Sequence, residues 1–131
     1  MKDEELLSPL SEAQTEIMNL IWEQGEATLV SICDSLSQRR DLARNTVQTQ
    51  LTRLVAKGWL LHRSEGKAFW YRAAFPQAVA QKMAVQRVVE TMFDGSTEGL
   101  VLSLLDGGKL SAREVERIRS FIDKFEEGEK P

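Results

Sequence analysis

The sequence predicts a mainly α-helical protein in two parts, in which three helices and a β-hairpin come first and three more helices follow. Three observations lead to this prediction. Apolar residues recur at i, i+3, i+4 and i+7, the spacing of a helix with one buried face. Between residues 59 and 74 the pattern changes to short runs rich in aromatic and branched side chains, which is typical of strands. From Pro76 onward the composition shifts again, so we place a domain boundary between residues 75 and 76.

Length and composition are those of a small cytoplasmic protein. The 131 residues are 42% hydrophobic and 28% charged, enough for one globular domain or one small domain with an appendage. No apolar run approaches the roughly 18 residues of a membrane span, and the acidic start MKDEELLSPL is unlike a secretory signal. The single cysteine, Cys33, excludes an internal disulfide and a multi-cysteine metal site, and we expect no metal, no cofactor and no membrane partner.

The first two helices have clear start signals. Ser11, with Gln14 three residues later, forms a capping box for the first helix, and Gly25 ends it. Thr28 caps the second helix, in which Cys33 is interpreted as a small core residue and not as a reactive thiol. Their buried stripes are predicted to be Ala13, Ile17, Leu20 and Ile21, and then Leu29, Ile32, Cys33 and Leu36.

The third helix, from Ala43 to Gly58, combines an apolar stripe with a polar face. Val47, Leu51 and Leu54 share one side, and short hydrogen-bonding side chains occupy the other. Asn and Gln pair with adenine edges, Thr contacts phosphate or the thymine methyl, and Arg pairs with guanine. Such a face alone is more typical of an ordinary solvated helix, so the neighbouring sequence decides. The predicted DNA-binding residues of this helix are Arg44, Asn45, Thr46, Gln48, Thr49, Thr52 and Arg53.

The charge distribution favours DNA binding although the net charge is −3. Residues 1 to 38 hold one base and eight acids, a net charge of −7, whereas residues 39 to 72 hold eight bases and two acids, a net charge of +6. Phosphate binding responds to the local field within about 10 Å and not to the total charge. The basic window contains the third helix, which favours DNA as its partner.

The start of the third helix is unusual for a free helix. The short turn from Gln38 to Leu42 joins it to the second helix as a helix-turn-helix, and only Asp41 offers a nearby side-chain cap. Arg44 opposes the helix dipole there. A phosphate would bind both Arg44 and the free backbone N–H groups, so we interpret this local misfit as a sign of a ligand.

Two strands are predicted after Gly58, Trp59 to Ser64 and Ala68 to Ala74. Three helices followed by such a hairpin describe a winged helix-turn-helix domain over residues 1–75, with a two- or three-stranded wing. We predict that Arg63 and Lys67, near the hairpin tip, contact phosphates beside the major groove.

The wing also carries aromatic side chains and the only histidine of the chain. Phe69, Trp70 and Tyr71 are expected to pack against the helices and not to stack on bases. His62 is interpreted as a surface or groove-edge residue and not as a metal ligand.

Residues 76–131 are predicted to form a three-helix dimerisation domain. One long helix ends at Asp94-Gly95, a short one starts at Ser96, and Ser111 with Glu114 is a capping box for the last. These helices bury too little surface to stand alone and expose much apolar surface, so we expect an isologous homodimer that fixes the separation of two third helices. The predicted dimerisation residues are Val85, Val89, Met92, Leu100, Val101, Leu104, Leu105, Val115, Ile118 and Ile122.

Over nearly its whole length the chain resembles the BlaI/MecI family of bacterial transcriptional repressors, also called penicillinase repressors. The matching segments are LSEAQTEIMNLIWEQG, NTVQTQLTRLVAKGWL, EGKAFWYRA and GLVLSLLDGGKLSAREVERIRSFID. The third-helix segment together with the tail is specific to the family. The resemblance implies an N-terminal winged-helix domain and a C-terminal dimerisation domain. It also implies a dimer that binds a dyad-symmetric operator and blocks transcription, commonly of β-lactam resistance genes.

The resemblance also has limits. In this family a protease cut at an Asn-Phe pair relieves repression, after a membrane sensor detects the antibiotic. The aligned pair here is Ser103-Leu104. Because the pair differs, the resemblance does not decide whether a regulatory protease cuts near Ser103-Leu104. It also does not decide whether β-lactam resistance is the regulated process. Copper-responsive relatives carry a C-terminal cysteine cluster, which the ending EEGEKP lacks.

The sequence therefore predicts a homodimeric, sequence-specific DNA-binding transcriptional repressor. The alternative is a winged-helix protein-interaction module that never binds DNA, which the acidic first helix would suit but the clustered bases would not. An enzyme has little support, because the chain has no histidine–cysteine pairing, serine motif or glycine-rich phosphate loop.

Overall fold

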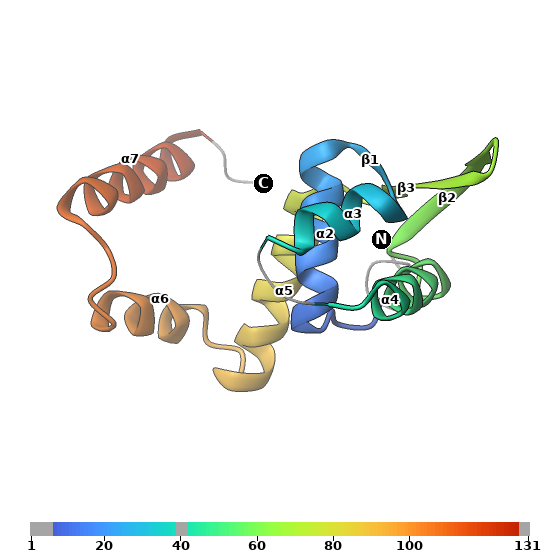
Figure 1. Ribbon diagram of the computed structural model, residues 1–131. Helices are drawn as coiled ribbons and strands as arrows, with labels where there is room; N and C mark the ends of the chain where they lie inside the picture. Colours follow the sequence, from blue (N-terminus) through green and yellow to red (C-terminus); the bar gives the residue numbers. More distant parts are fainter. Residues whose placement is uncertain (1–6, 39–41, 129–131) are drawn as a thin grey trace. The chain divides into compact units, whose positions relative to one another are not determined.

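The computed structural model describes residues 7–38 and 42–128 (Figure 1). Packing divides the chain into two compact units, Met1–Val85 and Gln86–Pro131. The predicted functional boundary at residue 75 falls just before the helix that crosses from one unit into the other, and it stays a prediction. In chain order the elements are α2 (Glu12–Gln24), β1 (Glu26–Thr28), α3 (Leu29–Leu36), α4 (Arg44–Ala56), β2 (Leu60–Glu65), β3 (Ala68–Ala73), α5 (Gln77–Met92), α6 (Thr97–Asp106) and α7 (Ala112–Gly128).

Capping boxes fix the starts of α2 and α3. Ser11 Oγ accepts from the Gln14 amide at 3.1 Å, and Gln14 Oε1 accepts from the Ser11 amide at 3.0 Å, as predicted. Thr28 and Ser31 exchange the same two bonds at the start of α3, at 3.2 and 3.1 Å. The partner of Thr28 was not predicted, because Glu or Gln is the usual residue at this position. Gly25 ends α2 with φ of 87°, a conformation that glycine adopts without strain.

The sheet is antiparallel and three-stranded, in the order β1-β3-β2. β3 pairs with β2 from Leu60↔Ala73 to Glu65↔Ala68, and with β1 from Glu26↔Arg72 to Thr28↔Trp70. The sequence predicts a wing of two or three strands, and the structure has three. β1 has only three residues, too few to show the alternating pattern of a strand.

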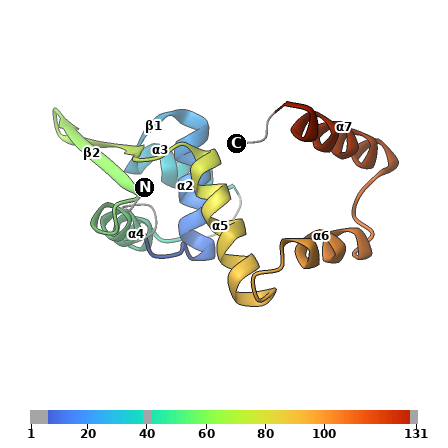
Figure 2. The ribbon, with the colours of Figure 1, turned by 180° about the vertical axis from the view of Figure 1, so that it is seen from behind.

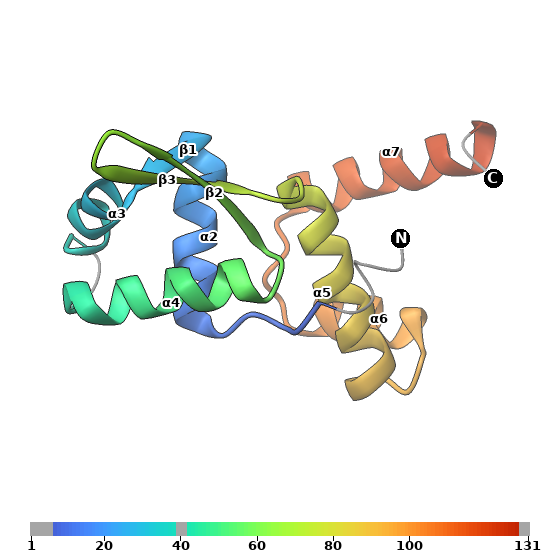
Figure 3. The ribbon, with the colours of Figure 1, turned by 90° about the vertical axis from the view of Figure 1, so that its right-hand side faces the viewer.

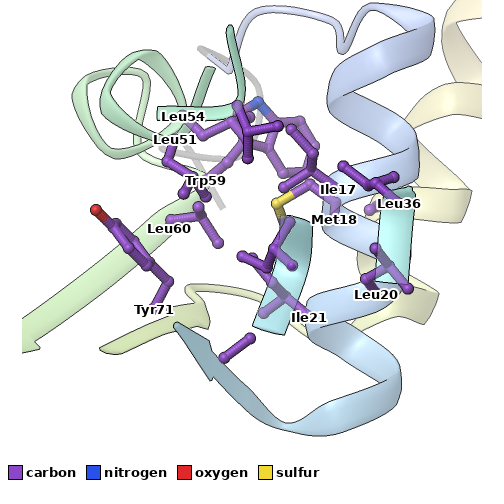
Figure 4. Packing of buried hydrophobic residues seen from close by; sticks show 14 of the residues in the cluster. Ile17, Met18, Leu20, Ile21, Leu36, Leu51, Leu54, Trp59, Leu60 and Tyr71 are labelled. Atoms are coloured by element: carbon purple, nitrogen blue, oxygen red, sulfur yellow. The ribbon is translucent and has the colours of Figure 1, made fainter. Parts of the chain in front are cut away.

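One hydrophobic core joins α2, α3, α4 and the sheet in the first unit (Figure 4). The predicted stripe of α4 is fully buried, since Val47, Leu51 and Leu54 are each 0% exposed. In α2 the predicted stripe needs one correction. Met18 is fully buried and Ala13 only partly so, because the helix packs against both α3 and the sheet and buries a broader face than one stripe.

The first half of α5 packs along α2 (Figure 2). The Trp22 indole N–H donates to the Phe75 carbonyl at 2.8 Å, and Gln77 Nε2 donates to Asn19 Oδ1 at 3.1 Å. Ala80 and Met83 add apolar contacts with the core. The segment directly after the wing is therefore part of the first unit.

The second unit exposes most of its apolar side chains. α6 and α7 contain no buried residue, although Ser96 caps α6 and the predicted Ser111–Glu114 capping box of α7 is formed. Val89, predicted to lie at the dimer surface, is only 2% exposed and is already covered within the chain. Among the described residues, no helix has the length and apolar character to cross a membrane.

Replacement of a buried residue of α4 should unfold the first unit more easily. We expect Leu51→Ala to lower the free energy of unfolding by about 2–5 kcal/mol, because it leaves a cavity in the core. Urea denaturation of the full chain, followed by tryptophan fluorescence, reports on this unit because it holds all three tryptophans, Trp22, Trp59 and Trp70. Leu61→Ala is the control, since Leu61 is 45% exposed. Equal effects of the two changes would contradict the prediction.

Candidate nucleic-acid interface

The polar face of α4 is open to solvent along its length. The buried stripe turns the opposite side of the helix outward, and α4 and the β2–β3 hairpin project on the same side of the first unit (Figures 1 and 3). All the residues of α4 predicted to bind DNA are exposed, namely Arg44, Asn45, Thr46, Gln48, Thr49, Thr52 and Arg53.

Two threonines on this face are held in one orientation by the helix itself. Thr49 Oγ1 donates to the Asn45 carbonyl at 2.9 Å, and Thr52 Oγ1 donates to the Gln48 carbonyl at 3.0 Å. Each hydroxyl has thereby used its only proton, so it presents an acceptor oxygen and a methyl group to the outside. This arrangement suits the amino groups and thymine methyls of base edges better than phosphate oxygens, which need a donor.

The first turn of α4 has no side-chain cap. Ala43 occupies the N-cap position without a side-chain hydrogen bond, and Arg44 follows it. The cap considered for Asp41 lies outside the described residues, as do Arg39 and Arg40 of the basic window. The uncapped first turn and the adjacent guanidinium remain suited to an anion.

A buried polar network holds α4 against α2. The side chain of Gln14, 5% exposed, donates to Gln50 Oε1 at 2.9 Å and accepts from Lys57 Nζ at 3.2 Å. Lys57 Nζ also donates to the Pro9 carbonyl at 3.3 Å. Lys57 belongs to the basic segment from residue 39 to residue 72, but its ammonium group is bonded within the protein. Sequence separations of more than 30 residues hid this network from local pattern analysis.

The register of the wing separates its two faces. Successive residues of a strand point to opposite sides, and directly paired residues point to the same side. The pairs His62↔Tyr71 and Arg63↔Trp70 therefore lie on opposite faces. His62 and Tyr71 line a cavity together with residues of α4, so theirs is the face toward α4. Arg63 lies on the other face.

Arg63 is paired with two carboxylates. Its Nε and Nη2 donate to Glu26 at 3.0 and 2.9 Å, its Nη1 donates to Glu65, and its guanidinium lies 5.6 Å from the centre of the Trp70 ring. The hydrogen bond from Arg63 lowers the pKa of Glu26, and the same carboxylates raise the pKa of Arg63. In the free protein the Arg63 side chain, a predicted phosphate contact, is therefore paired with Glu65, two residues away, and with Glu26, which is 37 residues away and which sequence proximity does not reveal.

The remaining residues singled out in the sequence differ in exposure. Lys67 is exposed beside Gly66 at the hairpin turn, and His62 is exposed, as predicted. Tyr71 packs into the core at 4% exposure, but Phe69 is 50% exposed, so the expected packing of the wing aromatics is wrong for Phe69. Burial raises the pKa of the Cys33 thiol, which agrees with its interpretation as a core residue.

The fold and the exposed face of α4 define a winged helix-turn-helix protein. The family model described as penicillinase repressor matches residues 10–124. The chain belongs to the penicillinase repressor family.

Two curated relatives match over most of their length. The methicillin resistance regulatory protein MecI of Mammaliicoccus sciuri is 27% identical over 115 residues, 88% of this chain and 94% of MecI. The penicillinase repressor of Bacillus licheniformis is 25% identical over 121 residues, 92% of this chain and 94% of that protein. Both alignments therefore extend through the wing and into the second unit.

Two solved structures resemble part of this chain. The DNA-binding domain of the repressor BlaI is 31% identical with a TM-score of 0.50, and the match covers 53% of this chain and 85% of that one. Monomeric Bacillus licheniformis BlaI in complex with the blaP half-operator is 30% identical with a TM-score of 0.50, and the match covers 56% and 89% of the two chains. Each match covers a little over half of this chain and most of the other one.

Release of Arg63 should strengthen binding to duplex DNA. We expect Glu26→Gln to raise the affinity up to about fivefold, because Arg63 then loses one of the two carboxylates that compete with phosphate. Fluorescence anisotropy with a labelled duplex at low salt measures the change. Glu126→Gln, in exposed α7, removes the same charge and should have little effect. Equal gains in both variants would show that only net charge matters.

Proposed function

We propose that this chain is a homodimeric, sequence-specific DNA-binding repressor of transcription that binds a dyad-symmetric operator. The observation that carries the proposal is the exposed polar face of α4, held outward by a stripe that is 0% exposed. The family assignment supports it, as does the half-operator complex of the Bacillus licheniformis relative. The repressor acts in the cytoplasm, without catalysis, metal or cofactor.

Within this proposal the residues of the interface have distinct roles. Asn45, Gln48, Thr49 and Thr52 contact base edges, and Arg53 pairs with guanine. Phosphates are bound at the uncapped start of α4 and by the wing, where Arg63 must exchange its carboxylates for phosphate oxygens. The phosphate-binding residues are Arg44, Thr46, Arg63 and Lys67.

The C-terminal helices supply the dimer contact, which includes Val85 at the end of the first unit. Apolar side chains project from α5, α6 and α7, and a second copy of the same surface would cover them. Leu100 and Val115 are already half-buried within the chain, so they lie beneath the proposed contact and expose less surface to it. The exposed members of the predicted set are Val85, Met92, Val101, Leu104, Leu105, Ile118 and Ile122, which are 50%, 78%, 46%, 57%, 51%, 40% and 52% exposed.

The proposed function does not require proteolysis. The Ser103–Leu104 bond lies within α6, and the Ser103 carbonyl accepts from the Gly107 amide at 3.0 Å. A protease acting there would first have to unwind this part of the helix. Release of the repressor by a cut near Ser103-Leu104 stays a prediction.

Substitutions on α4 and on the wing should affect binding differently. Thr49→Ala or Arg53→Ala should reduce discrimination between the operator and unrelated duplex by about 1–3 kcal/mol, because base contacts are lost. Lys67→Ala should weaken binding to every sequence and reduce the slope of log K against log salt by about one. Anisotropy titrations with both duplexes over a salt series measure these quantities.

The proposed function as a whole is tested with the wild-type protein. Absence of a bound species with DNA from its own promoter region at low salt would refute it.

A charge placed in the second unit should separate the dimer. We expect Leu104→Asp to give a monomer and to weaken binding to a full operator, because the two half-sites are no longer bound by linked subunits. Light scattering during size-exclusion chromatography measures the mass. Val30→Asp is the matched control, since Val30 on α3 is 54% exposed against 57% for Leu104. A Leu104→Asp dimer at micromolar concentration would contradict the prediction.

A further inference from the structure

We propose that His62 and Phe69 of the wing, together with the cavity between the wing and α4, bind a sugar–phosphate segment of the DNA backbone beside the bases that α4 contacts. The inference rests on the proposed function and adds two residues to its interface. The sequence predicts a surface or groove-edge position for His62 and packing against the helices for Phe69, without assigning either a DNA contact.

The cavity continues the exposed face of α4. It has a volume of about 160 Å³ and is lined by three residues of α4, Gln48, Thr52 and Val55, and three of the wing, His62, Phe69 and Tyr71. Gln48 and Thr52 also belong to the predicted base-contacting set. DNA that approaches these two side chains would bring part of its backbone to the mouth of the cavity.

Strand register places the wing side chains on the side of α4. The pairs His62↔Tyr71 and Ser64↔Phe69 share the face toward α4. The His62 ring contacts the Phe69 ring edge-on, with centroids 5.1 Å apart and an interplanar angle of 88°, and lies 6.2 Å from the Tyr71 ring. A single exposed phenylalanine needs no explanation, but Phe69 is half exposed at a cavity beside the predicted DNA-binding helix.

The lining matches the chemistry of a nucleic-acid backbone. A deoxyribose presents C–H groups, which suit Val55 and the rings of Phe69 and Tyr71, and the adjoining phosphate needs donors. Neutral imidazole has one N–H donor in either tautomer, and the Gln48 amide has two. No acidic residue lines this cavity, whereas Glu26 and Glu65 hold Arg63 on the opposite face of the wing. A phosphate therefore meets donors and no carboxylate on the side toward α4.

The size of the cavity argues against a different kind of ligand. A volume of about 160 Å³ is enough for a few small groups, such as part of one sugar ring. Pockets for drug-sized ligands measure about 300–1,000 Å³. A small segment of a long ligand, anchored mainly elsewhere, fits the cavity better than a separate effector molecule.

The test compares variants on the two faces of the wing in the full-length protein. We expect His62→Ala and Phe69→Ala each to weaken binding about five- to thirtyfold, for operator and unrelated duplex alike, because backbone contacts are independent of sequence. Leu61→Ala, on the opposite face and 45% exposed against 50% for Phe69, should change affinity less than twofold. His62→Gln retains a donor and should recover part of the loss. Urea denaturation verifies that the variants are folded.

A second measurement separates a contact from a structural role. Single operator phosphates are replaced by neutral methylphosphonates, and each duplex is titrated with wild-type protein and with His62→Ala. At one phosphate beside the half-site, neutralisation should weaken binding of the wild type but not of His62→Ala.

The outcomes distinguish this inference from the proposed function. If the wild type binds the operator and His62→Ala and Phe69→Ala bind like Leu61→Ala, the inference is wrong and the proposed function stands. If His62→Ala weakens binding but no phosphate is coupled to it, His62 acts on the fold of the wing and the inference is again wrong. If the wild type binds no duplex, the proposed function itself fails.

Discussion

Burial of three side chains on one side of α4 determines how the first unit presents its polar surface. Val47, Leu51 and Leu54 are inaccessible to solvent, and each contributes about 1.5–3 kcal/mol through burial. A helix rotated about its axis would lose that energy, so the opposite face must point outward. The network from Gln14 to Gln50 and Lys57 adds directional bonds to this non-directional attraction. The position and the rotation of α4 are thereby both specified.

The alternation of side chains along the strands gives the wing two different faces. One face holds Arg63 among Glu26, Glu65 and Trp70, where opposite charges already neutralise each other. The other face meets α4 with His62 and the aromatic rings and has no acid at the cavity. Of two neighbouring residues, Arg63 is therefore already bound to carboxylates, whereas His62 lies at a cavity that no carboxylate lines. A count of charged residues over this segment does not show this difference between the two faces.

The two units balance burial and exposure in opposite ways. The first unit buries its stripes in its own core and exposes polar groups, as a folded domain does. In the second unit α6 and α7 contain no buried residue and expose leucine, isoleucine and phenylalanine side chains. Such a surface is stable when a second copy covers it. A two-fold dimer formed in this way would also supply the second α4 that a dyad-symmetric operator requires.

The sequence by itself determined the features that arise from nearby residues. The capping boxes of α2 and α7, the positive φ of Gly25, the buried stripe of α4 and its exposed polar face all follow from helical periodicity and local hydrogen bonds. Only the tertiary structure decided which residues that are distant in the chain contact each other. It paired Arg63 with Glu26, turned Lys57 toward Gln14, added β1 to the sheet and brought the face of His62 and Phe69 toward α4. These contacts depend on strand register and on tertiary packing, which for Gln14 with Gln50 and for Arg63 with Glu26 joins residues 36 and 37 positions apart, and no local pattern encodes either.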